Sequence, residues 1–219
     1  MKLIAFDLDG TLCNTLQDIT DSLNRALAVG SFPTFTLEEV SGMVGRSITY
    51  MCQRAMPKGH ENDWENVQTR YFDDYARHLC DATRPYDGIL PLLSALKARG
   101  YLLACVTNKP HAHAVSIIQT LFPDHGKVFS QVQGQAKKFT LKPDPATLDF
   151  VMQHLGVSKE DAIYVGDSEV DVLFAENTGL RFVGCGWGFR GEAFLKECGA
   201  TTVIDTPMAL LNVLDDWKF

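Results

Sequence analysis

The sequence predicts an α/β protein: a doubly wound, Rossmann-like parallel sheet with an all-helical segment inserted after the first strand. Three observations support this fold class. Short apolar runs alternate with amphipathic helices over most of the chain, which is typical of a parallel sheet with helices on both faces. Residues 15–82 lack such runs and show helical periodicity only. The 219 residues, 46% hydrophobic and 21% charged, suit one domain with a large insertion or two small domains.

Six apolar runs are the expected strands. They cover residues 3–8, 101–107, 128–134, 162–167, 181–187 and, as the weakest, 201–205. Three helices between them have recognisable ends. "GILPLLSALKARG" stops at Gly100, and "PHAHAVSIIQTLF" begins at Pro110. "DPATLDFVMQHLG" has Asp144 as its N-cap, Pro145 as its first residue and Gly156 as its stop.

The inserted segment carries two apolar stripes at helical spacing. They are Leu16, Ile19, Leu23 and Leu27 in one helix, and Trp64, Val67, Tyr71 and Tyr75 in another. Capping boxes are expected at Thr15 with Asp18, and at Thr36 with Glu39. We therefore expect a core domain of residues 1–14 and 83–219 and a helical cap domain of residues 15–82. Such a cap can cover the carboxyl ends of the strands, where the sites of α/β proteins lie.

Charge and cysteine usage limit the class of protein. The net charge of −7, from 20 basic and 27 acidic residues, argues against broad nucleic-acid binding. No apolar stretch reaches the length of a membrane span, and Asp7 interrupts the start of the chain before a signal-peptide core can form. None of the six cysteines forms a CxxC pair. We expect a cytoplasmic protein that is a monomer or a homodimer.

Polar residues gather where the expected strands end. Asp7 and Asp9 follow the first strand two residues apart, so both can point to one side. Gly10 then lets the backbone turn and is expected to leave room for an incoming substrate phosphate. The other strand and loop ends supply Thr107, Asn108, Lys142, Asp167 and Asp171. In a parallel sheet all of these ends lie along one edge. That edge would hold four carboxylates, a hydroxyl, an amide and an ammonium group.

These residues also carry a family resemblance. "DLDGT", "VTN", "LKP" and "GDSEVD", in this order, resemble the haloacid dehalogenase-like hydrolase superfamily. "TNKP", the helical insertion and "GWGFRGE" look like its phosphoglycolate phosphatase group. The resemblance spans nearly the whole chain. It implies a Mg²⁺-dependent phosphatase that acts on a small phosphorylated metabolite.

The resemblance also implies roles for the matching residues. Asp7 would be the nucleophile and form an aspartyl-phosphate, and Asp9 would protonate the leaving oxygen and then activate water. Asp7, the backbone carbonyl of Asp9, and Asp167 would bind Mg²⁺. The remaining roles would be phosphoryl contacts for Thr107 and Asn108, charge balance for Lys142, and support of the metal or of Lys142 for Asp171.

Substrate choice is expected to lie in the cap. "GMVGRS" at residues 42–47 is the candidate substrate-facing loop, with Arg46 to pair with a carboxylate or phosphate. Phosphoglycolate is the first candidate substrate. The alternatives are a phosphomutase of the β-phosphoglucomutase kind, a nucleotide or pyrophosphate phosphatase, and a phosphometabolite-binding regulator without turnover.

Several residues near these motifs have no assigned role. Trp187, Phe189 and Arg190 either line the mouth of the site or only pack a loop. Cys13 is expected to be a filler residue rather than a redox switch. His111 and His113 are spaced like a second metal site, but no acidic partner is near them in sequence, which argues against one. Thr107 and Asn108 are also expected to cap the helix that begins at Pro110.

Overall fold

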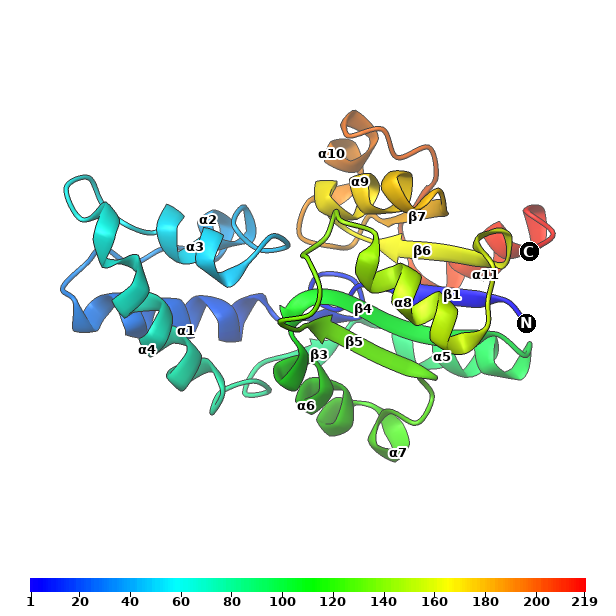
Figure 1. The fold of residues 1–219 in the computed structure, drawn as a ribbon, viewed down its shortest axis with the longest axis horizontal. Coiled ribbons are helices and arrows are strands. Elements are labelled where there is room, and N and C mark those ends of the chain that lie inside the picture. Colours follow the sequence, from blue (N-terminus) through cyan, green and yellow to red (C-terminus); the bar gives the residue numbers. More distant parts are fainter.

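A computed structural model describes all residues 1–219, which form two lobes side by side (Figure 1). The larger lobe contains a six-stranded sheet whose paired strands are all parallel. Its strand order is β5 (Gln131–Gln135), β4 (Leu102–Pro110), β1 (Leu3–Phe6), β6 (Ala162–Gly166), β7 (Arg181–Cys185) and β8 (Val203–Ile204). After β1 the chain adds β4 and β5 on one side of it, and then β6, β7 and β8 on the other side. The switch point of this doubly wound sheet is therefore at β1, which confirms the predicted fold class.

All six predicted strands are present, with shifted ends. The largest difference is β4, which continues to Pro110 instead of stopping at residue 107. Its pairing with β5 has an irregularity between Val106 and Pro110, after which Pro110 still pairs with Gln135. Thr107 and Asn108 therefore lie within this irregular stretch of β4 and not after its end.

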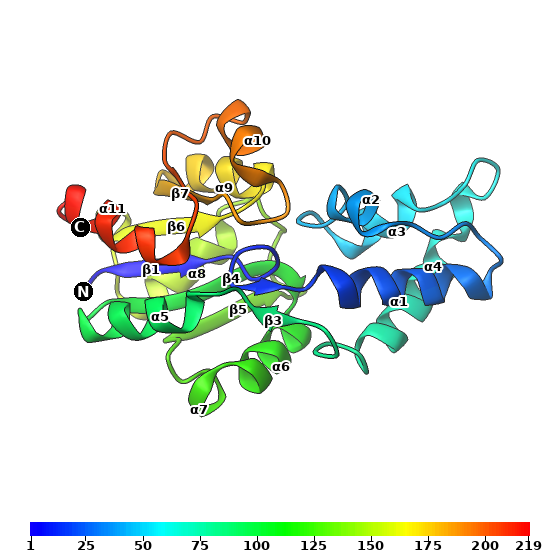
Figure 2. The same cartoon turned by 180° about the vertical axis from the view of Figure 1, so that it is seen from behind.

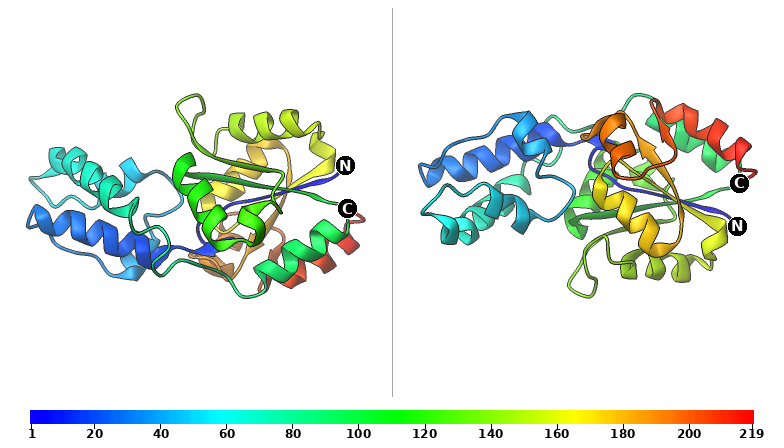
Figure 3. Two further views of the ribbon diagram at one scale, coloured as in Figure 1. Left: turned by 90° about the horizontal axis from the view of Figure 1, so that it is seen from below. Right: turned by 90° about the horizontal axis from the view of Figure 1, so that it is seen from above.

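Helices cover both faces of the sheet. α5 (Ile89–Ala98), α6 (His111–Leu121) and α11 (Leu210–Asp216) pack on one face, and α8 (Ala146–Leu155) and α9 (Glu169–Thr178) pack on the other (Figures 2 and 3). α10 (Gly191–Glu197) packs beside α9 against β7 and β8 through the buried Leu195, and the short α7 (Pro123–Gly126) packs on α6. The 3-10 helices η2 (Lys159–Asp161) and η3 (Pro207–Ala209) precede β6 and α11.

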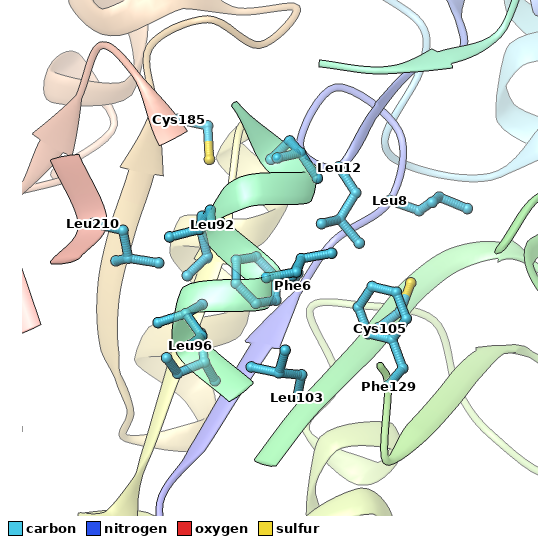
Figure 4. Close-up of a cluster of buried hydrophobic side chains, with 14 of the residues drawn as sticks. Phe6, Leu8, Leu12, Leu92, Leu96, Leu103, Cys105, Phe129, Cys185 and Leu210 are labelled. Carbon is cyan, nitrogen blue, oxygen red and sulfur yellow. The ribbon is translucent and has the colours of Figure 1, made fainter. Parts of the chain in front are cut away.

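The β1 strand divides its side chains between the two resulting cores. Phe6 belongs with Leu92 and Leu96 of α5 in the larger core (Figure 4), whereas Leu3 and Ala5 belong to the core under α8 and α9. All four residues of β1 are 0–1% exposed. Such two-sided burial is the physical reason why the central strand is a continuous apolar run.

The smaller lobe consists of four helices, α1 (Leu16–Val29), α2 (Leu37–Ser41), α3 (Ile48–Arg54) and α4 (Trp64–Tyr75), and the 3-10 turn η1 (Glu61–Asp63). Its own core contains six of the eight predicted stripe residues, while Leu16 and Trp64 are only partly buried. The capping box at Thr36 is confirmed, because its hydroxyl accepts from the Glu39 N–H at 3.3 Å and the Glu39 carboxylate accepts from the Thr36 N–H at 2.8 Å.

The second predicted capping box, at Thr15 and Asp18, is wrong. The Thr15 hydroxyl donates to Asp9 Oδ1 at 2.7 Å. The Asp18 carboxylate is buried and accepts from the Ala82 and Thr83 N–H groups, each at 2.8 Å, and from the Thr83 hydroxyl at 2.7 Å. Three donors satisfy a buried carboxylate better than one helix N-terminus can. Asp18 thus fastens α1 to the returning linker.

Two short strands, β2 (Cys13–Asn14) and β3 (Arg84–Pro85), pair antiparallel where the chain enters and leaves the smaller lobe. That residues 1–14 with 83–219, and residues 15–82, behave as separate domains stays a prediction. None of the helices combines the length and apolar character needed to cross a lipid bilayer.

Candidate active site

An acidic trio lies at the carboxyl ends of β1 and β6. Asp7, Asp167 and Asp171 each bring one carboxylate oxygen within 4.8 Å of the others, and all three residues are buried. Asp7 directly follows β1, Asp167 directly follows β6, and Asp171 lies in the first turn of α9. Burial, with repulsion from Asp171 and Asp9, raises the pKa of Asp7 to about 6 even though Lys142 lowers it. Burial and the charges of Asp171 and Asp7 raise the pKa of Asp167 well above its usual range.

Lys142 is the cation of this cluster. Its Nζ lies 2.7 Å from Asp171 Oδ1 and 3.0 Å from Asp7 Oδ2, and it donates to the Tyr164 hydroxyl at 2.9 Å. Burial alone would lower the pKa of this lysine, but the charges of Asp171 and Asp7 outweigh it and raise the pKa. One ammonium group thus pairs with two of the three carboxylates, and Asp167 has no ion-pair partner, so acidic groups outnumber the one basic group of the cluster.

The trio fits a hard divalent cation. Its donors are carboxylate oxygens only, which Mg²⁺ prefers, and the spare negative charge is the charge that such an ion balances. Two of the carboxylates are also oriented by the protein. Asp167 accepts from the Thr11 hydroxyl and from the Phe189 N–H, each at 2.9 Å. Asp171 Oδ2 accepts from the Asp167 and Ser168 N–H groups and from the Ser168 hydroxyl at 3.2, 3.1 and 2.7 Å.

Gly10 is required by the closeness of this cluster. It has φ of +78°, and a Cβ atom at this position would lie 2.1 Å from Asp167 Oδ2. The positive φ agrees with the turn predicted at Gly10. The room beside Gly10 is occupied by the carboxylate of Asp167, so a phosphate contact at Gly10 stays a prediction.

Asp9 points away from the trio toward the smaller lobe, which is called the cap from here on. Its Oδ1 accepts from the Thr15 hydroxyl at 2.7 Å and from Lys109 Nζ at 2.8 Å. The Lys109 side chain is only 3% exposed, and its ammonium lies 4.7 Å from the centre of the Tyr75 ring. Sequence reasoning missed Lys109. Strand alternation from Thr107 to Lys109 is the signal that could have found it, since i and i+2 share a face.

Thr107 lies beside Asp7 and Asn108 beside the backbone of Lys142, but neither residue caps α6. The residue that precedes α6 is Pro110, and no side chain accepts from the first turn. A hydrogen bond from the Thr107 hydroxyl lowers the pKa of Asp7. The Asn108 amide accepts from the Lys142 N–H at 2.8 Å and donates to the Gly45 and Lys142 carbonyls at 3.1 and 3.3 Å. The Asn108 side chain therefore connects the loop that carries Lys142 to Gly45 of the cap.

A pocket of about 490 Å³, part of it open to solvent, lies between the cap and these groups. Its polar end contains Asp7, Asp9, Thr107, Asn108 and Lys109, and its other walls are Ile19, Met43, Val44, Gly45, Arg46, Ser47, Ile48, Met51, Tyr71, Tyr75 and Pro110. The predicted cap loop, residues 42–47, thus supplies one wall. Arg46 lies at its edge, half exposed, with its guanidinium 3.4 Å from Glu169 Oε1 and 4.8 Å from the centre of the Tyr50 ring.

The residues without an assigned role have distinct surroundings. Trp187 donates from Nε1 to the Thr11 carbonyl at 3.1 Å, so it holds the turn after β1. Cys13 is buried, and burial raises the pKa of its thiol, which makes it unreactive. His111 and His113 are part of no group of three metal-binding side chains, the acidic trio being the one such group in the chain.

Comparisons with known proteins agree with this arrangement. A family model described as haloacid dehalogenase-like hydrolase matches residues 4–185. The phosphoglycolate phosphatase of Haemophilus influenzae is 33% identical over 97% of this chain and 98% of its own. That of Rhodospirillum rubrum is 34% identical over 99% of this chain and 90% of its own. The crystal structure of a predicted phosphoglycolate phosphatase from Haemophilus somnus has a TM-score of 0.88 at 28% identity, covering 97% of each chain.

Proposed function

Because the chain belongs to the haloacid dehalogenase-like hydrolase family, as a phosphoric monoester hydrolase of its phosphoglycolate phosphatase-like group, we propose that it is a Mg²⁺-dependent phosphatase for a small phosphomonoester. Phosphoglycolate is the first candidate substrate, since it is named for relatives that match over nearly their full length. The observation that carries the proposal is the buried Asp7 carboxylate, held 3.0 Å from Lys142 at the polar end of a pocket.

Asp7 would act as the nucleophile. One of its carboxylate oxygens would attack phosphorus and form an aspartyl-phosphate, while the bond from phosphorus to the leaving oxygen breaks. Lys142 and the Thr107 hydroxyl are placed beside Asp7 to balance the negative charge that gathers there. Mg²⁺, held by Asp7, Asp167 and the Asp9 carbonyl with Asp171 behind them, would neutralise charge on the phosphoryl group.

Asp9 would move the protons. It gives one to the leaving oxygen in the first step and takes one from water in the second, when water attacks phosphorus and releases Asp7 and inorganic phosphate. Its position in the pocket, outside the buried trio, suits a group that must meet both the leaving oxygen and water. Thr15 and Lys109 are its present partners.

The surroundings of this chemistry are also part of the proposal. We expect a cytoplasmic enzyme, because six free cysteines suit a reducing compartment. We expect Arg46 to contact the substrate's leaving group from the rim of the pocket. The substrate is a small phosphorylated metabolite, and the enzyme is a monomer or a homodimer.

The test is Mg²⁺-dependent phosphate release from phosphoglycolate, sugar phosphates, nucleotides and pyrophosphate. Asp7→Asn should lose activity by roughly 10³-fold or more, as the loss of a nucleophile does. Asp216→Asn, an exposed carboxylate on α11, is the matched control and should keep full activity. Release no greater than that of Asp7→Asn on every compound would contradict the proposal.

Other outcomes of this panel would identify the alternatives. Phosphate transfer to a sugar phosphate in place of water would indicate a phosphomutase. Preference for a nucleotide or pyrophosphate would change the substrate class and keep the chemistry. Saturable binding of a metabolite without turnover would indicate a regulator.

A further inference from the structure

Arg190 connects the loop after β7 to the cap. Its Nη1 donates to the Ser41 carbonyl at 2.6 Å, and its Nη2 donates to the Gly42 and Val44 carbonyls at 3.2 and 3.3 Å. Its Nε donates to Glu169 Oε2 at 3.1 Å, and its side chain is only 11% exposed. One guanidinium therefore spans from α9 in the core to the end of α2 and the cap loop of residues 42–47.

Two further contacts hold the same cap loop against the core. Asn108 donates to the Gly45 carbonyl at 3.1 Å, and Arg46 pairs loosely with the second oxygen of Glu169 at 3.4 Å. A Cβ atom on Gly45 would be in van der Waals contact with Ser168 at 3.5 Å, so the loop runs close to the start of α9. Among these contacts Arg190 makes the most hydrogen bonds to the loop.

The segment that carries Arg190 is itself fastened to the acidic site. The Phe189 N–H donates to Asp167 Oδ2 at 2.9 Å, and Trp187 Nε1 donates to the Thr11 carbonyl at 3.1 Å. Residues 187–190 therefore contact both the Asp167 carboxylate, through Phe189, and the cap loop, through Arg190. The cap loop in turn forms the pocket wall that includes Met43, Val44 and Gly45.

We propose that Arg190 is a positioning residue that fixes the cap loop over the acidic site and thereby sets how tightly the substrate's leaving group is held. The inference rests on the proposed function, because it concerns the pocket in which that substrate would bind. Arg190 contacts no reacting group, since all its hydrogen bonds go to Glu169 and to cap carbonyls. It acts through the loop.

Arginine is needed here for its shape. A guanidinium offers five N–H donors in a rigid plane, and Arg190 uses them on three carbonyls and one carboxylate at once. A lysine offers one ammonium on a flexible stem and cannot reach all four acceptors. Arg190→Lys should therefore keep the charge beside Glu169 and lose most of the loop contacts.

The experiment is hydrogen–deuterium exchange of the cap loop in wild type, Arg190→Met and Arg190→Lys. The Met43 and Val44 amides, which donate to the Val40 carbonyl at 2.8 and 3.2 Å, are the reporters. Their exchange should rise about tenfold or more in Arg190→Met and less in Arg190→Lys. Arg99→Met is the control, because it breaks an exposed ion pair with Asp215 far from the cap, and it should leave these amides unchanged.

Steady-state kinetics give the second measurement. Arg190→Met should raise KM for the preferred substrate about tenfold and change kcat less than threefold, because uniform binding is lost and not a group that reacts. Circular dichroism and the melting temperature of each variant establish that it is folded.

Each outcome decides the proposal. Unchanged exchange at Met43 and Val44 in Arg190→Met would overturn it, and so would exchange that rises equally over the whole chain. A fall in kcat with no change in KM would also overturn it. If the wild type releases phosphate from no substrate, the proposed function fails, whereas the exchange measurement still decides whether Arg190 holds the loop.

Discussion

Replacing Lys142 by methionine would test how the charges of the site are balanced. Lys142→Met keeps an unbranched side chain of similar length and removes the only cation within ion-pair distance of Asp7 and Asp171. The lysine side chain is 2% exposed, so water cannot replace it without rearrangement. We expect a loss of stability that is larger at neutral pH than in mild acid, because the Asp7 part of it is removed by protonation whereas the lost contact to Asp171 remains.

The size of this loss follows from the pKa of Asp7. In the wild type that pKa is about 6, above the ordinary 3.8, so the folded state binds a proton as the pH falls through this window. Stability therefore declines as the pH rises from about 4 to 6 and levels off above it. Without Lys142 the pKa of Asp7 rises further, and stability keeps falling above pH 6 by about 1.4 kcal/mol per pH unit until that higher pKa is reached. Breaking a buried ion pair by removing one partner costs about 3–5 kcal/mol, which is the size of loss we expect at pH 8.

Urea unfolding in EDTA at pH 8 and pH 5.5 measures the difference. At pH 5.5 the Asp7 carboxyl is mostly protonated in both proteins, so the difference in stability should shrink to the part that comes from the lost contact to Asp171. Tyr164→Phe is the control, because it removes an uncharged partner of Lys142 and should cost about 1 kcal/mol at both pH values. An equal loss in Lys142→Met at the two pH values would refute the electrostatic reasoning and point to packing.

Three further predictions concern the metal, the turn after β1 and Asp9. Mg²⁺ should raise the melting temperature more at pH 7.5 than at pH 5. At pH 5 the Asp7 carboxyl, whose pKa is about 6, is protonated about ten times as often as it is ionised, so protons compete with the ion. Equal shifts at the two pH values would contradict the metal site. Gly10→Ala should abolish that shift and reduce activity, since its Cβ would overlap Asp167, whereas Gly100→Ala, also at positive φ but in open space, should cost only about 1–2 kcal/mol of stability in a thermal melt. Lys109→Met should cost about 1–3 kcal/mol in urea unfolding at pH 7, because Asp9 loses its buried partner, and no loss would mean that the ion pair is dispensable.

The fold and the acidic trio were predictable because their signals are local. Asp7 and Asp167 each follow directly on a buried apolar strand, and parallel strand ends share an edge, so two short motifs far apart in sequence predict one cluster. The alternation of strands and helices gives the layers in the same way. The capping box predicted at Asp18 was wrong, although its spacing fits, because the donors that satisfy Asp18 come from residues 82 and 83.

Lys109 and Arg190 show what sequence reasoning lacks at this site. Both side chains stand beside predicted motifs, but their acceptors lie elsewhere in the chain. Lys109 donates to Asp9 in the turn after β1, and Arg190 donates to three cap carbonyls near Gly42. Every residue has a backbone carbonyl, so the sequence does not indicate which carbonyls an arginine side chain will contact. The chemical core of such an enzyme is thus readable from strand ends, whereas the contacts that seat its cap depend on how two independently packed lobes meet.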